Sequence, residues 1–396
     1  MQRIGIFGGT FNPPHLGHIQ AAKQAMEALG LTKILFIPNY SAPHKTLPQD
    51  SPTPEQRLEM LTLALAKEPQ MEASDLELRR EGISYTVDTL SALLKQYPGA
   101  ELTLLVGTDM FLSFSHWVQW ETILKEVSLG VFYRGEKGEK EAIENQCREL
   151  TALGARVALV HNPVVAISST QLRRLLAFRC ADAFLPEGVG DYIREHGLYH
   201  TAADWKKLPM EELQQVVISL LNPNRVNHVL GCRDTAVALA RHWGANETDA
   251  ARAGILHDIT KAIDGPLQLT LCEAYGKILG DFSRRYPKTL HALTGSMVAE
   301  RIFGENAAVV DAICYHTTGK ADMNLLETII YVADYMEPNR SFPGVEKLRA
   351  LAYSDITGAL KLGLEMTLEH LKEQGSEVSP KSREALEYLK DYIPKS

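Results

Sequence analysis

The strongest constraint on the fold is a change of hydrophobic pattern near residue 200. Before this point, short strand-like runs alternate with amphipathic helical stretches; the runs include KILFIPN, MEASDLEL, ELTLLVG, VSLGVFYR and RVALVHN. Such alternation predicts an α/β domain with a doubly wound parallel sheet. From about Asp204 the segments, such as LLETIIYVADYME, carry helical periodicity and almost no strand-like alternation. The sequence therefore predicts an α/β domain over residues 1–202, followed by an all-α domain over residues 203–396.

Length and net charge limit the class of protein to which the chain can belong. The chain has 396 residues, which favours two or three domains. Its net charge of -8 argues against a general nucleic-acid surface and favours nucleotides as partners. No apolar stretch approaches the length of a membrane span, and no signal-like segment opens the chain. We therefore expect a cytoplasmic protein with no nucleic-acid or membrane partner; a homo-oligomer is left open.

A glycine pair followed by two histidines stands near the beginning of the chain. An apolar run over residues 4–7 ends at Gly8 and Gly9, a Pro-rich turn follows, and helical periodicity begins at Leu16. Glycines at a strand end let a phosphate approach the backbone, and a helix start offers free N–H groups. His15 and His18 are three positions apart, so both rings can converge on one charged group. A Walker loop and a dinucleotide fingerprint are excluded, because the lysine of the first and the third glycine of the second are missing.

The run GGTFNPPHLGH resembles the signature of the nucleotidyltransferase superfamily, and its FNPPH core resembles the nicotinate-nucleotide adenylyltransferase branch. Further segments match that branch in the same order: FIPNYSAPHK, SYTVDTL, LVGTDMFLSFSHW, ISSTQLRRL and VGDYIREHGLY. The resemblance covers about half of the chain. It implies that an AMP group passes from ATP, which brings Mg²⁺, to nicotinate mononucleotide, giving deamido-NAD and pyrophosphate.

Adenylyl transfer to a phosphate acceptor needs no enzyme nucleophile, so the protein has to hold two polyanions and neutralise charge as pyrophosphate leaves. His15 and His18 suit this task as donors. Arg173 adds a forked cation one turn into a helix that Ser169 or Thr170 can cap. Trp117 matches the family's ring-stacking position, although Val118 stands where the family often has an aromatic residue. The other nucleotide- and acceptor-binding positions that the resemblance implies are Gly8, Gly9, Thr10, Phe11, His44, Lys45, Thr86, Gly107, Asp109, Ser168, Ser169 and Thr170.

Four histidines and two aspartates lie in apolar helical contexts in the second half: His228, His257, Asp258, His291, His316 and Asp334. Each one alone can be explained as a buried polar residue or an exposed helix position. The full series H…HD…H…H…D resembles the HD-domain metallophosphohydrolases. The segment VADYMEPNR resembles the bacterial branch that hydrolyses diadenosine tetraphosphate symmetrically.

This second resemblance, over roughly residues 205–390, implies two divalent ions bridged by Asp258. The ligands implied for one ion are His228, His257 and Asp334, and those for the other are His291 and His316. Nitrogen and oxygen donors without a thiolate suit iron, the first expectation, or manganese or zinc. Two such ions can polarise a phosphoryl oxygen and supply hydroxide at neutral pH. Lys261 and Arg340 are candidates for contacts with substrate phosphates.

The sequence thus predicts a fusion of a nicotinate-nucleotide adenylyltransferase with a di-metal hydrolase of dinucleoside polyphosphates. Two alternatives stay open. The helical half could bind a nucleotide without turnover or act on another nucleotide. The acceptor of the first half could be nicotinamide mononucleotide or another phosphate ester.

Overall fold

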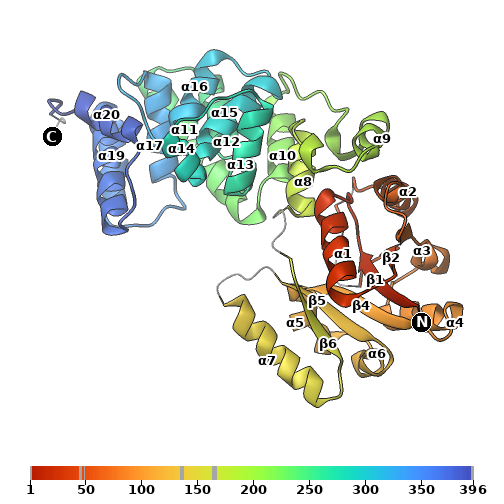
Figure 1. Cartoon of the computed structure of the whole chain (residues 1–396). Coiled ribbons are helices and arrows are strands. Elements are labelled where there is room, and N and C mark those ends of the chain that lie inside the picture. Colours follow the sequence, from red (N-terminus) through yellow and green to blue (C-terminus); the bar gives the residue numbers. More distant parts are fainter. Residues whose placement is uncertain (1, 44–46, 49, 134–137, 163–166, 394–396) are drawn as a thin grey trace. The chain divides into compact units, whose positions relative to one another are not determined.

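The chain forms two compact units, Met1–Ala202 and Ala203–Ser396, in a computed structural model (Figure 1). The structure describes residues 2–43, 47–48, 50–133, 138–162 and 167–393. Each unit has its own set of elements.

The described residues of the first unit form a six-stranded sheet in which every pairing is parallel. Its strands are β1 Arg3–Gly9, β2 Lys33–Pro38, β3 Met71–Ala73, β4 Glu101–Gly107, β5 Ser128–Tyr133 and β6 Val157–His161. The strand order is β3-β2-β1-β4-β5-β6. The order therefore reverses between β1 and β4, and a doubly wound sheet binds its ligands outside the carboxyl ends of the strands at such a point.

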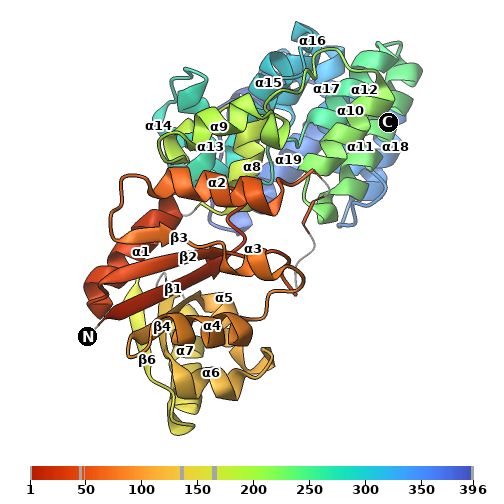
Figure 2. The ribbon, with the colours of Figure 1, turned by 90° about the vertical axis from the view of Figure 1, so that its right-hand side faces the viewer.

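Helices cover both faces of this sheet (Figure 2). The helices of this unit are α1 Leu16–Leu29, α2 Pro54–Leu65, α3 Leu76–Arg80, α4 Thr86–Gln96, α5 Thr108–Leu112, α6 Trp120–Glu126, α7 Glu139–Ala152, α8 Ser169–Ala177 and α9 Val189–Glu195. Apolar side chains of α4, α6 and α7 form one core with alternate residues of the strands, among them Ile4 and Ile6 of β1. Helix α1 packs on β1, β2, β5 and β6, and α2 packs on β2 and β3. This arrangement confirms the predicted doubly wound domain.

The structure of the segment MEASDLEL differs from the strand that its sequence pattern predicts. Only Met71–Ala73 pairs with β2, and α3 begins at Leu76. The side chain of Ser74 accepts a hydrogen bond from the Leu76 amide at 3.4 Å, which offers the backbone an alternative to the ladder. The strand therefore ends at Ala73, although the alternation of apolar residues in the sequence goes on beyond it.

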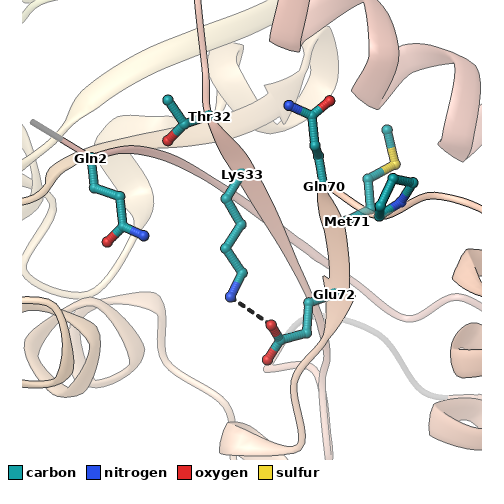
Figure 3. A pocket seen from close by; sticks show the side chains of 7 residues that line it. Gln2, Thr32, Lys33, Gln70, Met71 and Glu72 are labelled. Atoms are coloured by element: carbon teal, nitrogen blue, oxygen red, sulfur yellow. Dashed lines mark ion pairs between the residues drawn. The ribbon is translucent and has the colours of Figure 1, made fainter.

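A cavity of about 600 Å³ lies at the amino ends of β2 and β3, beside an ion pair of 2.5 Å between Lys33 and Glu72 (Figure 3). The glycine-rich loops after β1 and β4 lie at the carboxyl ends of their strands, the other edge of the sheet. Because parallel sheets bind ligands at their carboxyl edge, we assign no function to this cavity.

The described residues of the second unit form helices and no strand, which confirms the predicted all-α domain. The helices are α10 Met210–Leu220, α11 Val226–Trp243, α12 Glu247–Leu256, α13 Gly265–Ala274, α14 Asp281–Arg285, α15 His291–Arg301, α16 Ala307–Tyr315, α17 Leu325–Met336, α18 Val345–Ser354, α19 Ile356–Glu373 and α20 Pro380–Tyr388. Helices α11, α12, α16 and α17 pack on one another, and α15 packs on α16. No helix in the described ranges is both long and apolar enough to cross a bilayer.

Asparagine caps set the beginnings of three of these central helices. The side chains of Asn246, Asn306 and Asn324 each accept a hydrogen bond from a backbone amide in the first turn of α12, α16 and α17, respectively. Such caps satisfy amides that have no partner within the helix. At the other ends of α12 and α16, the C-cap residues are His257 and His316. Both lie in the interior of the unit.

Candidate functional site

The two histidines of the first motif lie face to face at the start of α1. His15 is the N-cap residue, and its ring stacks on that of His18 with centroids 3.7 Å apart. The backbone amide of His15 donates a hydrogen bond to His18 Nδ1 at 3.2 Å. A neutral His18 ring therefore carries its proton on Nε2, which makes Nε2 a donor. Nδ1 of His15 has no hydrogen-bond partner among the described residues.

Burial keeps both imidazoles neutral. It lowers the pKa of His15 to about 4. Burial and the neighbouring His15 hold the pKa of His18 well below its usual range. The His18 ring also packs edge-on against Phe11, with centroids 5.1 Å apart, and against Phe7. The pair is thus a fixed set of neutral donors and not a pair of mobile surface cations.

Helix α8 comes late in the sequence of the first unit and contacts the Pro-rich loop that follows β1. Its N-cap is Ser168, whose hydroxyl accepts from the Gln171 amide at 3.2 Å, so the predicted cap at Ser169 or Thr170 was wrong. The Ser169 hydroxyl instead donates to the Pro13 carbonyl at 3.2 Å. The local sequence offered three consecutive hydroxyl residues, and packing of α8 against the loop decides which one caps.

Arg173 also holds this loop. Its guanidinium donates to the Asn12 carbonyl at 2.9 Å and to the Thr170 hydroxyl at 3.1 Å. Burial lowers the pKa of Arg173, although an arginine stays charged at neutral pH. The residue therefore combines a positive charge near the candidate phosphate site with a grip on the loop that carries the histidines.

A cavity of about 850 Å³ opens at the carboxyl edge of the sheet. Its lining includes these predicted site residues: His15, His18, Gly107, Asp109, Ser168 and Ser169. A second cavity of about 460 Å³ is lined by Gly8, Gly9, Thr10, Thr86 and Trp117, among others. Phe7, Gly107 and Met110 line both cavities, so the two are neighbours. Predicted site residues His44 and Lys45 lie outside the described residues.

The second cavity has an aromatic wall and a buried carboxyl group. Trp117 packs on Phe114, with ring centroids 5.1 Å apart, and is partly buried against the edge of the core while it lines this cavity. Thr86 is the first residue of α4, and the exposed Val118 also lines this space. Glu77, which the motifs did not indicate, accepts a hydrogen bond from Thr89 at 2.6 Å, and burial raises its pKa.

Two further residues that the motifs did not indicate hold the loop after β1. Arg57 on α2 is fully buried and donates to the backbone carbonyls of Thr10 at 2.8 Å and Asn39 at 2.7 Å. The hydroxyl of Tyr199, near the end of the unit, donates to Asn12 Oδ1 at 2.6 Å. A signal for Arg57 exists in the sequence, because its charge falls on the apolar face of an amphipathic helix.

In the second unit, the predicted histidines and aspartates come together from five places in the sequence. His228 lies on α11, His257 and Asp258 follow α12, His291 opens α15, His316 follows α16 and Asp334 lies on α17. Each histidine and Asp258 exposes no more than 8% of its surface. Two groups have ligand atoms within 4.8 Å of one another: His228, His257 and Asp334, and His257, Asp258 and His316.

Asp258 lies between two pairs of imidazoles, His228 with His257 and His291 with His316. Its Oδ2 is 3.5 Å from His257 Nε2 and 3.6 Å from His228 Nε2. Its Oδ1 is 3.5 Å from His291 Nε2 and 3.8 Å from His316 Nε2. One carboxylate thus presents a separate oxygen to each pair of imidazoles, which is the arrangement a bridging ligand needs.

The donor chemistry of the cluster fits divalent ions. Nδ1 of His257, His316 and His291 lies 2.8, 2.7 and 3.0 Å from the backbone carbonyl three residues earlier, so each ring has its proton on Nδ1. The lone pairs on Nε2 then converge with two carboxylates. Burial opposes ionisation of Asp334, but its contact with the His228 ring and the nearby positive charges outweigh burial and hold the pKa of Asp334 well below its usual range. Imidazole nitrogens and carboxylate oxygens gathered at one buried point are a donor set that suits divalent transition-metal ions.

Three cations surround this cluster. Lys261 Nζ lies 3.0 Å from His291 Nε2, and burial lowers the pKa of Lys261 to about 8. Arg340 pairs with Asp334 at 2.6 Å. Arg225, which the motifs did not indicate, forms an ion pair with Asp258. Its position three residues before His228, on the same turn, is the sequence signal that could have pointed to it.

Two family models match the chain. The cytidylyltransferase-like model matches residues 6–175, and the HD domain model matches residues 225–339. The first begins within β1 and extends through β6 and most of α8, and the second covers the elements that carry the histidine and aspartate cluster. The second unit thus contains an HD domain.

Curated relatives match about half of the chain. The probable nicotinate-nucleotide adenylyltransferase of Symbiobacterium thermophilum is 39% identical over 201 residues, which are 50% of this chain and 96% of that protein. Its namesake in Aeromonas salmonicida is 40% identical over 208 residues, again 50% of this chain and 96% of the relative.

Two solved structures also match about half of the chain each. One, described as a predicted HD superfamily hydrolase involved in NAD metabolism from Clostridium acetobutylicum, is 35% identical, covers 47% of this chain and 99% of its own, and has a TM-score of 0.46. The nicotinic acid mononucleotide adenylyltransferase of Plasmodium falciparum complexed with NaAD is 18% identical, covers 51% and 98%, and has a TM-score of 0.42. From the identity to its curated relatives and the near-complete coverage of them, the chain belongs to the nicotinate-nucleotide adenylyltransferase family, to which it adds an HD domain.

Proposed function

We propose that the first unit transfers an AMP group from ATP to nicotinate mononucleotide, with release of pyrophosphate and formation of deamido-NAD. The observation that carries this proposal is the stacked pair His15 and His18 at a helix start, lining a cavity that neighbours a second one. The larger cavity has room for a nucleoside triphosphate and its Mg²⁺, and the smaller one has room for the acceptor's ring.

Each group has a role that follows from its geometry. The protonated Nε2 of His18 and the ring of His15 donate hydrogen bonds to the phosphates and stabilise the charge that develops as pyrophosphate leaves. Amides at the starts of α1 and α8 add donors for the same anion. Arg173 contributes positive charge while it holds the loop. The acceptor's own phosphate attacks, so the protein acts by positioning and by charge stabilisation.

The identity of the acceptor can be tested kinetically. Trp117 and Thr86 line the smaller cavity, and we expect the ring of nicotinate mononucleotide to stack on the indole. The kcat/KM for the acid acceptor should exceed that for nicotinamide mononucleotide. Trp117→Ala should raise the KM for the acceptor and leave the KM for ATP nearly unchanged, and Trp120→Ala is the matched control. Equal kcat/KM for both acceptors would contradict the assignment.

We propose that the second unit hydrolyses diadenosine tetraphosphate with two divalent ions. Support comes from the separate oxygens that Asp258 presents to two pairs of imidazoles. When bound, a pair of divalent ions supplies Lewis-acid polarisation of a phosphoryl oxygen and activates water at neutral pH. Arg225, Lys261 and Arg340 lie around the cluster and can bind the polyphosphate.

One experiment distinguishes this hydrolase from a unit that senses nucleotides without turnover. The metal content of the purified full chain is measured, and the products formed from diadenosine tetraphosphate are identified. We expect two ions, with iron as the first expectation, and two ADP, because the proposed attack is at an inner phosphorus. ATP plus AMP would contradict symmetrical cleavage, and nucleotide binding without any product would favour the sensor.

A further inference from the structure

His228 is oriented differently from the other three imidazoles of the cluster. Those three present Nδ1 to a backbone carbonyl of their own helical turn. Nδ1 of His228 instead lies 3.1 Å from Oε1 of Glu337, a residue 109 positions later in the sequence. The partner of His228 is thus an ionisable side chain. A substitution can change it, whereas the backbone carbonyls that contact the other three histidines cannot be changed in this way.

Glu337 is itself held by a dedicated set of donors. It exposes 1% of its surface. Its Oε2 accepts hydrogen bonds from the backbone amide and the side-chain amide of Asn339, both at 2.8 Å. Arg349 donates to its backbone carbonyl at 2.9 Å. The carboxylate therefore faces donors on both sides, His228 at one oxygen and Asn339 at the other.

Helix α11 leaves room for this carboxylate by carrying glycine at position 231. A Cβ atom placed there would overlap Glu337 Oε2 and would lie 3.1 Å from Asn339 Nδ2. Distances below about 3.0 Å are not found for real Cβ contacts. Gly231 lies one turn after His228, so the same helix provides both the imidazole and the space for its partner.

We propose that Glu337 is a positioning residue for the metal ion held by His228, His257 and Asp334, an inference that rests on the metal site of the proposed function. Its carboxylate accepts the Nδ1 proton of His228, which fixes the ring and directs the Nε2 lone pair at the ion. A carboxylate behind an imidazole also makes that imidazole a more basic ligand. Glu337 touches His228 and none of the other imidazoles of the cluster, so its effect should fall on one of the two ions.

The test substitutes Glu337→Gln in the full chain and measures Mn²⁺ binding. A glutamine has one carbonyl oxygen, so its NH₂ must face either His228 or the donors of Asn339, and the negative charge is lost. We expect one Mn²⁺ equivalent to bind as in the wild type and the other to bind about 10–100-fold more weakly. Electron paramagnetic resonance provides a second readout, because the spin-coupled pair of the wild type should give way to the spectrum of isolated Mn²⁺.

Glu327→Gln is the matched control. Glu327 is an equally buried carboxylate in the first turn of α17, the helix that ends at Glu337, and its partners are Lys320 and the Asn324 amide. This variant should bind two Mn²⁺ like the wild type. If Glu337→Gln does not fold by circular dichroism, Asn339→Ala replaces it; the exposed Asn339 leaves the carboxylate in place, and a smaller loss of affinity is expected at the same ion.

The outcomes separate this inference from the proposed function. Two Mn²⁺ bound by the wild type and by Glu337→Gln with equal affinity would overturn the positioning role alone. Equal weakening of both ions would also overturn it, because that result indicates a general structural effect. A wild-type chain that binds no pair of Mn²⁺, Fe²⁺ or Zn²⁺ ions would overturn the metal site and this inference with it.

Discussion

The hydrogen bond from the His15 amide fixes which nitrogen of His18 carries the proton. With Nδ1 occupied as an acceptor, the donor of a neutral ring is Nε2. Both histidines have lowered pKa values because they are buried, so the free site presents neutral donors at neutral pH. Charge stabilisation in the transition state would therefore come from directed N–H groups and from Arg173.

This tautomer leads to a prediction at His18. The substitution His18→Ala should lower the rate of adenylyl transfer by about 10²–10³, the usual cost of one stabilising donor. His18→Gln should retain more activity than His18→Asn, because the glutamine amide reaches the position of Nε2 and the asparagine amide reaches that of Nδ1. Steady-state kinetics of the three variants measures this order. Near-normal transfer by His18→Ala would contradict the assignment, and unchanged hydrolase activity is the internal control.

Several of the most informative side chains could not be predicted from the sequence. The partners of Arg57, Glu337 and Tyr199 lie 47, 109 and 187 positions away. A motif shows which residues can do chemistry, whereas such a contact depends on how distant elements pack. Of the three, Arg57 came nearest to being predictable, since a charge on an apolar helix face has to find a partner.

At the scale of elements, α2 ties together the ends of two strands. Arg57 joins the carbonyls that follow β1 and β2, and the loop between β1 and α1 includes Phe11 at a φ of 48°, in the left-handed region. A non-glycine residue adopts this conformation at a cost, and the surrounding contacts have to maintain it. Arg57 thus contributes to the geometry of the histidine loop without lining either cavity.

We predict that Arg57→Met lowers both stability and transfer. The variant leaves buried carbonyls without donors, which costs about 2 kcal/mol of the free energy of unfolding. Small displacements of the loop should reduce transfer by about 10²-fold. Thermal unfolding and initial rates measure the two effects. Thr62→Ala, on the same helix and exposed, is the control; normal transfer by a destabilised Arg57→Met would show that the residue is structural only.

Other features of the elements show where a local pattern is insufficient. The alternation of runs predicted the parallel sheet correctly, because a doubly wound sheet follows from strands that alternate with helices. The strand order, and hence the adjacency of the loops after β1 and β4, follows from packing and was not read from the pattern. The cap of α8 at Ser168 and the short β3 are local choices that competing hydrogen bonds decide.

On the scale of the whole molecule, each unit contains its own candidate site. The cavities with the histidine pair are lined by residues before position 170, and the histidine and aspartate cluster lies after position 227. No described residue is shared by the two sites. Activities that depend on separate residues should respond separately to substitution.

We therefore predict that Asp258→Ala abolishes hydrolysis of diadenosine tetraphosphate and lowers metal content, while adenylyl transfer is unchanged. Both oxygens of this carboxylate face imidazoles, so its loss leaves neither ion fully ligated. Metal analysis and the two activity assays on one preparation provide the measurements. Retained hydrolysis would refute the bridging role. A parallel fall in transfer would indicate coupling if circular dichroism shows an intact fold.

The contact between Tyr199 and Asn12 has a consequence for where the chain can be divided. The hydroxyl that steadies the histidine loop belongs to nearly the last residues of the first unit, just before Ala203 begins the second. An expression fragment trimmed back to the end of the sheet, or even to the end of α9, would retain every strand and still lose this support. The same limit applies to the connection between the two units. It cannot be shortened by deleting residues just before Ala203, because these residues include Tyr199.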